Sequence, residues 1–222
     1  MTPYDFTDLF VLDMANNHQG DEAHALRIIE ECGQVVRKLG LKAALKFQFR
    51  NIETFIHPDF IDRSDVPHIP RFRDTRLTDE TYLRLSQAVQ EAGLITMCTP
   101  FDEVSVDKIT AMDLEIIKIA SCSATDFPLL EKACSAKKPI IASTAGLSLS
   151  QIDRLVSFFE HHGADFALMH CVAIYPTPAE KLNLNQIDEL RTRYPNCVIG
   201  FSTHEDPENL QAVGMAVAKG AQ

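Results

Sequence analysis

The sequence predicts an α/β fold, a TIM (β/α)8 barrel that is incomplete at its C-terminus and forms a single domain over residues 1–222. Short apolar runs recur at regular intervals, and nearly all are continuous, as in parallel strands buried on both faces. Amphipathic segments with helical spacing separate them. No Gly-x-Gly-x-x-Gly pattern follows the first run, which favours a barrel, with a flavodoxin-like open sheet as the alternative.

Taken in order, strands and helices alternate along the whole chain. The predicted strands are Phe10–Met14, Ala43–Phe49, Leu94–Thr99, Ile116–Ala120, Pro139–Ser143, Phe166–Cys171 and Val198–Ser202. The predicted helices are Glu22–Leu39, Asp79–Ala92, Val104–Ala111, Pro128–Ala136, Ser150–His162, Asn185–Arg193 and Pro207–Lys219. Thr78 and either Ser148 or Ser150 are expected to cap helix starts, and Gly40, Gly93 and Gly163 to end helices.

Two segments depart from this regular alternation. Only Gly220, Ala221 and Gln222 follow the last helical pattern, where an eighth strand is expected. Because an open barrel exposes a sheet edge, we expect the chain to be a fragment of a longer protein. The longest loop, Arg50–Leu77, contains Pro58, Pro67 and Pro70, which suits a cover over an active site.

Composition excludes several classes of protein. The net charge is −10 and no basic stripe occurs, so nucleic acid is not an expected partner. No apolar run approaches the ~20 residues that span a bilayer, and the N-terminus lacks a secretory signal, so we expect a cytoplasmic protein without a membrane partner. The six cysteines show no C-x-x-C pair and are expected to be reduced, with a nucleophilic Cys122 or Cys171 as the alternative.

Polar residues gather where the predicted strands end, which is where barrel enzymes carry their chemistry. Lys46 and Lys118 lie inside apolar strands, and a buried ammonium is costly unless it is paired or binds an anion. We therefore expect a phosphate or carboxylate site, with internal pairing to Asp13 and Glu115 as the alternative. Hydroxyls suited to an oxyanion follow the later strands, at Ser121, Ser143, Thr144 and Ser202.

The histidines divide by position. His204 follows the seventh strand and precedes two acidic residues, so it is a candidate metal ligand. His170 lies inside a strand and is expected to be structural, whereas His18 suits either a site or a loop. The pair His161-His162 ends a helix and is expected to interact with the helix dipole.

Seven motifs in register resemble the sialic acid synthase family, the phosphoenolpyruvate-dependent synthases of N-acetylneuraminate and related nonulosonic acids, including the spore-coat polysaccharide branch. They are Asn-Asn-His-Gln-Gly, Leu-Lys-Phe-Gln, Cys-Thr-Pro-Phe-Asp, Ile-Lys-Ile-Ala-Ser, Ala-Ser-Thr-Ala-Gly, Met-His-Cys-Val-Ala-Ile-Tyr-Pro-Thr-Pro and Ile-Gly-Phe-Ser-Thr-His. The resemblance spans nearly the whole chain. It implies a transferase that condenses phosphoenolpyruvate with an N-acyl aldose for surface polysaccharide biosynthesis.

The resemblance also implies roles for individual residues. The phosphoenolpyruvate pocket would comprise Lys46, Thr99, Lys118, Ser121, Ser143 and Ser202, and the sugar would face Gln48 and Tyr175. His204 would be the first of two histidines that bind Mn²⁺ or Mg²⁺, which polarises the sugar aldehyde in such enzymes. In members of the family, the second histidine and an antifreeze-like domain follow the part that this chain resembles. The family's members form homodimers.

Four positions depart from the family pattern. Asp13 stands where the family usually has glutamate, and Ser123 stands where an acid is common. Together with the two matching lysines, the residues expected at the catalytic positions are Asp13, Lys46, Lys118 and Ser123. Ala173 replaces an asparagine and Thr203 replaces an aspartate, which alters the expected sugar and metal surroundings.

The sequence is also compatible with two other functions. Lys46 or Lys118 could form a Schiff base, as in aldolases, because a desolvated lysine is a good nucleophile. Alternatively, the protein could bind sugar or phosphate without turnover, which the serine at position 123 favours.

Overall fold

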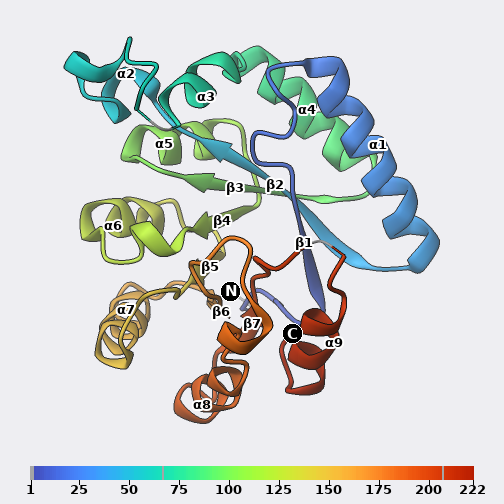
Figure 1. Cartoon of the computed structure of the whole chain (residues 1–222), viewed down its shortest axis with the longest axis vertical. Coiled ribbons are helices and arrows are strands. Elements are labelled where there is room, and N and C mark those ends of the chain that lie inside the picture. The colour runs from blue at the N-terminus through green and yellow to red at the C-terminus, as the bar shows by residue number, and fades with distance from the viewer. Residues whose placement is uncertain (1–2, 67, 207) are drawn as a thin grey trace. The chain divides into compact units, whose positions relative to one another are not determined.

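The strands follow one another in the sheet in the order in which they occur in the chain, β1-β2-β3-β4-β5-β6-β7. The structure is a computed structural model that describes residues 3–66, 68–206 and 208–222 (Figure 1). It divides into two compact units, Leu9–Ile117 and Met1–Asp8 with Lys118–Gln222, which are called unit A and unit B below. The predicted fold class, an incomplete α/β barrel with strands and helices in alternation, is confirmed, and the described residues hold seven strands.

Unit A contains the first three strands and the start of the fourth, all in parallel register. Its elements are β1 (Leu9–Asp13), α1 (Glu22–Leu39), β2 (Lys42–Phe49), α2 (Ile52–Phe55), the 3-10 helix η1 (Pro58–Phe60), α3 (Ile69–Asp74), α4 (Asp79–Glu91), β3 (Ile95–Pro100), α5 (Glu103–Ala111) and β4 (Ile116–Ile119). Parallel register sets Asp13 beside Lys46 and Gln48 beside Thr99. The strand ends of unit A therefore carry polar residues side by side.

Unit B contains the rest of β4 and the later strands. Its further elements are η2 (Ser121–Ser123), α6 (Phe127–Ser135), β5 (Ile140–Ser143), α7 (Leu149–His161), β6 (Phe166–His170), η3 (Ala179–Lys181), α8 (Asn185–Arg193), β7 (Val198–Phe201) and α9 (Gln211–Ala218). Strands β5, β6 and β7 pair in parallel, with Ser143 beside Met169 and His170 beside Phe201. Each strand again ends in a polar residue or just before one.

Every predicted strand is present, with ends that differ by one residue or less. The last helix differs most, because α9 begins at Gln211 and the predicted start, Pro207, lies outside the described residues. The predicted loop 50–77 is wrong as a loop, since it holds α2, η1 and α3. These helices are too short to show a helical period in sequence. Their apolar side chains Ile52, Ile56 and Ile69 form a small core of their own. Pro67 of this segment lies outside the described residues.

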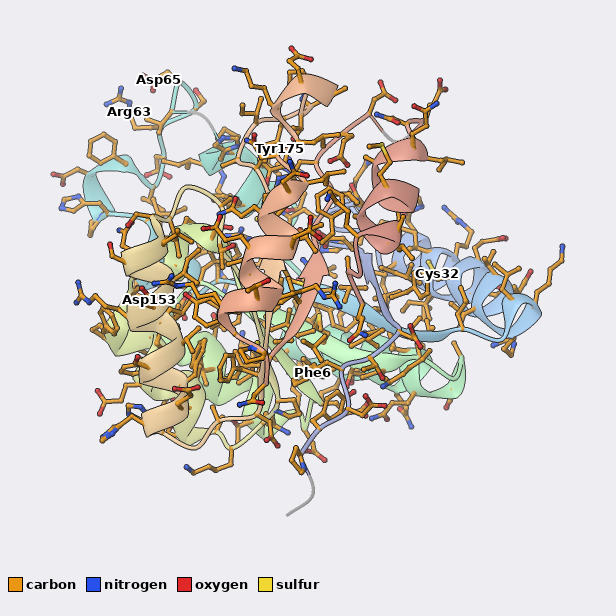
Figure 2. All side chains as sticks on the ribbon, turned by 90° about the horizontal axis from the view of Figure 1, so that it is seen from below. Phe6, Cys32, Arg63, Asp65, Asp153 and Tyr175 are labelled. Atoms are coloured by element: carbon orange, nitrogen blue, oxygen red, sulfur yellow. The ribbon has the colours of Figure 1, made fainter. Side chains whose placement is uncertain are left out.

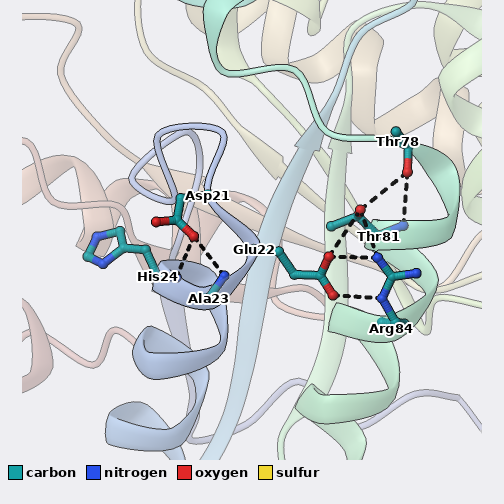
Figure 3. A network of polar contacts seen from close by, with 7 residues as sticks. All are labelled: Asp21, Glu22, Ala23, His24, Thr78, Thr81 and Arg84. Carbon is teal, nitrogen blue, oxygen red and sulfur yellow. Dashed lines mark hydrogen bonds and ion pairs between the residues drawn. The ribbon is translucent and has the colours of Figure 1, made fainter.

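Side-chain caps fix where the principal helices of unit A begin (Figure 3). Asp21 accepts hydrogen bonds from the backbone of Ala23 and His24 at the start of α1, and Thr78 accepts one from Thr81 at the start of α4. The Arg84 guanidinium of α4 binds the Glu22 carboxylate of α1 through two hydrogen bonds of 2.6 Å. The two helix starts are therefore held to each other, and the arginine lowers the pKa of Glu22.

Several expectations from composition can be compared with the described residues. All six cysteines are free, and burial raises the pKa of Cys98 and Cys197, so these two stay protonated near neutral pH. Ser148, with Gln151, forms the capping box that starts α7. Within the described ranges, no helix combines the length and apolarity needed to cross a bilayer.

Candidate active site

The first polar cluster of unit A pairs Lys46 of β2 with Asp13 of β1. Their side chains form an ion pair of 2.9 Å between Nζ and Oδ1. The Lys46 side chain is 10% exposed and that of Asp13 is 53% exposed. Internal pairing of Lys46 with Asp13, one of the two alternatives in the sequence, is therefore present. The carboxylate of the pair is half exposed to solvent, whereas the ammonium is nearly buried.

Strand alternation decides which β2 side chains face the cluster. One side of β2 carries Lys46 and Gln48, and Arg50 follows at the same spacing directly after the strand. The other side carries Phe47 and Phe49. Both phenyl rings pack against Tyr82 of α4, with ring centroids 5.8 and 4.7 Å away. Aromatic packing on one side thus fixes the polar row on the other.

A cavity of about 550 Å³ lies within unit A beside the end of β2. Its lining includes Asn16 from the loop after β1, Gln48 of β2, Arg50 directly after β2, and Phe72 of α3, with residues 75–80 at and before the start of α4. Arg50 donates a 3.1 Å hydrogen bond from Nη2 to Oε1 of Gln48. Gln48 was expected at a sugar site, and its side chain does line a cavity large enough for a small ligand.

Thr99 and His18 are both buried in unit A. Thr99 is the β3 partner of Gln48 and is 3% exposed. His18 has no exposed surface, its Nδ1 accepts a 3.1 Å hydrogen bond from the Gly20 backbone, and its Nε2 has no partner among the described residues. Burial, with a smaller contribution from His24, lowers the pKa of His18. His18 is therefore a neutral residue that shapes the loop carrying Asn16.

The first cluster of unit B centres on Lys118 of β4. Its Nζ donates hydrogen bonds to Oγ of Ser143 on β5 at 2.5 Å and to the Ile119 carbonyl at 2.8 Å. Lys118 is 7% exposed and Ser143 is 4% exposed. Glu115, the partner that the sequence alternative gave Lys118, instead accepts hydrogen bonds from the backbone and hydroxyl of Thr96. Lys118 thus places a buried cation against the Ser143 hydroxyl and the Ile119 carbonyl, an arrangement suited to an anionic ligand.

The serines after β4 differ in their surroundings. Ser121 Oγ accepts a hydrogen bond of 3.1 Å from the Ala145 backbone and lies 3.3 Å from Sγ of Cys171. Ser123 is 7% exposed, and its hydroxyl lies 3.9 Å from Sγ of Cys122. Ser121 is therefore held in the loop beside β5, while Ser123 offers a hydroxyl where a carboxyl group would exchange protons more readily.

The second cluster of unit B joins Tyr175 and His204. The Tyr175 hydroxyl lies 2.8 Å from Nε2 of His204, and the two rings lie 4.0 Å apart between centroids. Nδ1 of His204 lies 2.5 Å from the Val172 carbonyl. Tyr175, labelled in Figure 2, is 72% exposed and precedes a cis peptide bond to Pro176. Ser202 follows β7, where its backbone N–H donates to the carbonyl of His170.

The histidine assignments can be compared with these contacts. His170 is buried, and its Nε2 lies 2.8 Å from the Leu182 carbonyl, so the structural role predicted for it is confirmed. Both ring nitrogens of His204 are hydrogen-bonded, and the described residues contain no group of three or more histidine, cysteine or acidic side chains placed to hold a metal. The described residues therefore do not make a metal site by themselves.

Sequence reasoning missed Arg50 as a site residue. It was counted as the start of a loop, whereas the structure sets its guanidinium in the cavity wall beside Gln48. Arg50 follows Gln48 by two residues and Lys46 by four, a signal that was present in the sequence, because side chains at even spacing share a strand face.

Comparison with known proteins identifies relatives over most of the chain. The model of the NeuB family matches residues 37–222. N-acetylneuraminate-9-phosphate synthase of Drosophila melanogaster is 32% identical over 203 residues, which cover 88% of this chain and 53% of that protein. The chain spans about half the length of the curated relatives that it matches.

Two solved structures extend the comparison. A protein of Chromobacterium violaceum assigned as spore coat polysaccharide biosynthesis protein E is 46% identical, with a TM-score of 0.94, and the match covers 97% of this chain and 64% of that one. N-acetylneuraminic acid synthetase of Leptospira borgpetersenii, solved in complex with citrate, is 29% identical, with a TM-score of 0.84 and coverage of 96% and 70%.

Proposed function

Because this chain belongs to the NeuB family, we propose that the protein condenses phosphoenolpyruvate with an N-acyl aldose to give a sialic-acid-like nonulosonic acid. The relatives named above include a synthase of a sialic acid phosphate and a protein of polysaccharide biosynthesis. We place the product in surface polysaccharide biosynthesis on that basis. The sugar, the metal and a homodimeric state are parts of the same proposal.

The observation that carries the proposal is the buried Lys118 ammonium held by Ser143. A buried ammonium held by a hydroxyl and a carbonyl oxygen at a strand end suits the binding of a phosphate or carboxylate. Phosphoenolpyruvate carries both groups. The relative from Leptospira borgpetersenii was solved in complex with citrate, which is a carboxylate anion.

In the proposed reaction, carbon 3 of phosphoenolpyruvate attacks the aldehyde carbon and forms the new carbon–carbon bond. Water adds to carbon 2, and inorganic phosphate leaves, so the products are a 2-keto acid and phosphate. Lys118 and Ser143 would stabilise the anionic substrate and the departing phosphate. Within unit A, Asp13 would hold the Lys46 ammonium and supply a carboxylate for proton transfer.

The test uses the complete gene product with phosphoenolpyruvate, Mn²⁺ and a panel of N-acylated hexosamines. We expect release of inorganic phosphate together with a product whose mass is that of the sugar plus pyruvate. Lys118→Met should abolish release, whereas Lys38→Met, a matched change at an exposed position on α1, should leave it unchanged. No release with any sugar would contradict the proposal.

Two additions to this assay separate the alternatives. Chelation of the metal, followed by its return, tests the Mn²⁺ or Mg²⁺ requirement directly. Borohydride treatment in the presence of a keto substrate would trap a Schiff base at Lys46 or Lys118, and a trapped adduct would replace the proposed mechanism by an aldolase mechanism. Phosphoenolpyruvate binding without turnover would instead favour the non-catalytic alternative, which the hydroxyl of Ser123 supports.

A further inference from the structure

Arg50 occupies an unusual position at the end of β2. Its guanidinium carbon lies 3.8 Å from the ring centroid of Phe101, 4.3 Å from that of Phe72 and 5.9 Å from that of Phe55. A guanidinium stacked between aromatic faces keeps its plane fixed, and each contact adds stabilisation. The side chain is therefore held in one orientation in the wall of the unit A cavity.

These aromatic residues come from three separate segments of unit A. Phe101 follows β3, while Phe55 and Phe72 belong to α2 and α3 of the segment 51–74. That segment has its own small apolar core, formed by Ile52, Ile56 and Ile69 with partly buried neighbours. Through these contacts, Arg50 connects the segment 51–74 to the end of the strand that carries Lys46 and Gln48.

A second contact fixes the start of the segment 51–74. The Asp102 carboxylate accepts one hydrogen bond of 2.7 Å from the Asn51 backbone and another of 2.7 Å from the Ser105 backbone at the start of α5. The residue directly after Arg50 is therefore tied to the end of β3. With its backbone and its side chain both held, Arg50 has little freedom to move away from Gln48.

The contact with Arg50 determines how the Gln48 amide can bind a ligand. Arg50 donates to Oε1 of Gln48, so that oxygen is engaged and the amide NH₂ is the end left to face a ligand. We propose that Arg50 is a positioning residue that makes Gln48 a hydrogen-bond donor toward the cavity. The cavity then selects a ligand group that accepts hydrogen bonds, namely the acyl carbonyl or a hydroxyl oxygen of the sugar. The inference rests on the proposed function, which it deepens.

The test measures binding without turnover, using a borohydride-reduced N-acetylhexosamine that lacks the reactive aldehyde. For Arg50→Met, calorimetry should show the affinity for this alditol about 10- to 100-fold weaker, as expected for loss of a hydrogen bond from a charged donor. Affinity for phosphoenolpyruvate should be unchanged. Arg50→Lys keeps the charge and a donor, and should recover part of the loss. Arg63→Lys is the matched control, since the guanidinium carbon of Arg63 lies 5.6 Å from the Phe60 ring centroid and Arg63 does not line the cavity.

The pairing with Gln48 makes the outcome specific. In a Gln48→Leu background, Arg50→Met should weaken alditol binding by less than about twofold, because the group it positions is gone. Equal losses for alditol and phosphoenolpyruvate, additive losses in the double variant, or no binding of the alditol by the parent protein would each overturn the inference. Binding that depends on Arg50 without phosphate release in any assay would refute the proposed function and leave the role of Arg50 intact.

Discussion

The hydrogen bond between Lys118 and Ser143 allows a quantitative prediction. Ser143→Ala removes the hydroxyl that accepts from Nζ at 2.5 Å, within a site where both residues are less than a tenth exposed. A hydrogen bond to a charged group contributes about 1.5–3 kcal/mol, which for a chain of this size corresponds to a fall in Tm of about 3–12 °C. The Michaelis constant for phosphoenolpyruvate should rise with it.

A double-mutant cycle with Lys118→Met isolates the interaction. Tm and urea midpoints are measured by circular dichroism for the parent, both single variants and the double variant. We expect a coupling energy of about 1.5–3 kcal/mol. Ser135→Ala is the control, because Ser135 is exposed and donates only to the Lys132 carbonyl of its own helix. A coupling energy below about 0.5 kcal/mol would refute the view that Ser143 holds the Lys118 ammonium.

Two further predictions concern ion pairs. Asp13→Asn should lower kcat at least about tenfold, because the carboxylate faces Lys46 and is proposed to transfer a proton. The free energy of unfolding should fall by only about 1 kcal/mol, because the carboxylate is half exposed. Unchanged turnover would exclude Asp13 from the reaction. Hydrogen bonds from Arg193 and Tyr194 hold the pKa of Asp153 down at about 2, so the stability that this carboxylate supplies is complete above its ordinary pKa of 3.8 and is lost as the pH falls toward 2. The Tm difference between the parent and Asp153→Asn should therefore shrink over that range, and a difference independent of pH would contradict the assignment.

The local pattern of the sequence was sufficient to predict most of the fold. Continuous apolar runs placed all seven strands, and helical spacing placed α1 and α8 to the residue. Thr78, and either Ser148 or Ser150, were predicted as caps, and the structure has Thr78 and Ser148 in that role. Periodicity and capping depend on residues within a few positions of one another, which is why a single sequence reveals them.

The partners of the polar residues could be anticipated only where register fixes them. Asp13 and Lys46 meet because adjacent parallel strands align them, and this pairing was among the alternatives. The pairing of Lys118 with Ser143 instead depends on packing between residues 25 positions apart. Sequence reasoning proposed Glu115 for Lys118, but the carboxylate of Glu115 is bound by Thr96.

The sequence by itself determined the alternation of strands and helices and the presence of polar residues at strand ends, since both follow from local spacing. Tertiary structure alone decided that α2, η1 and α3 form with a small core of their own, and that three aromatic rings lie within 6 Å of the Arg50 guanidinium beside Gln48. Short helices gain most of their stability from tertiary contacts rather than from intrinsic propensity. An arginine finds its aromatic partners only when separate segments pack together, and no local pattern encodes that.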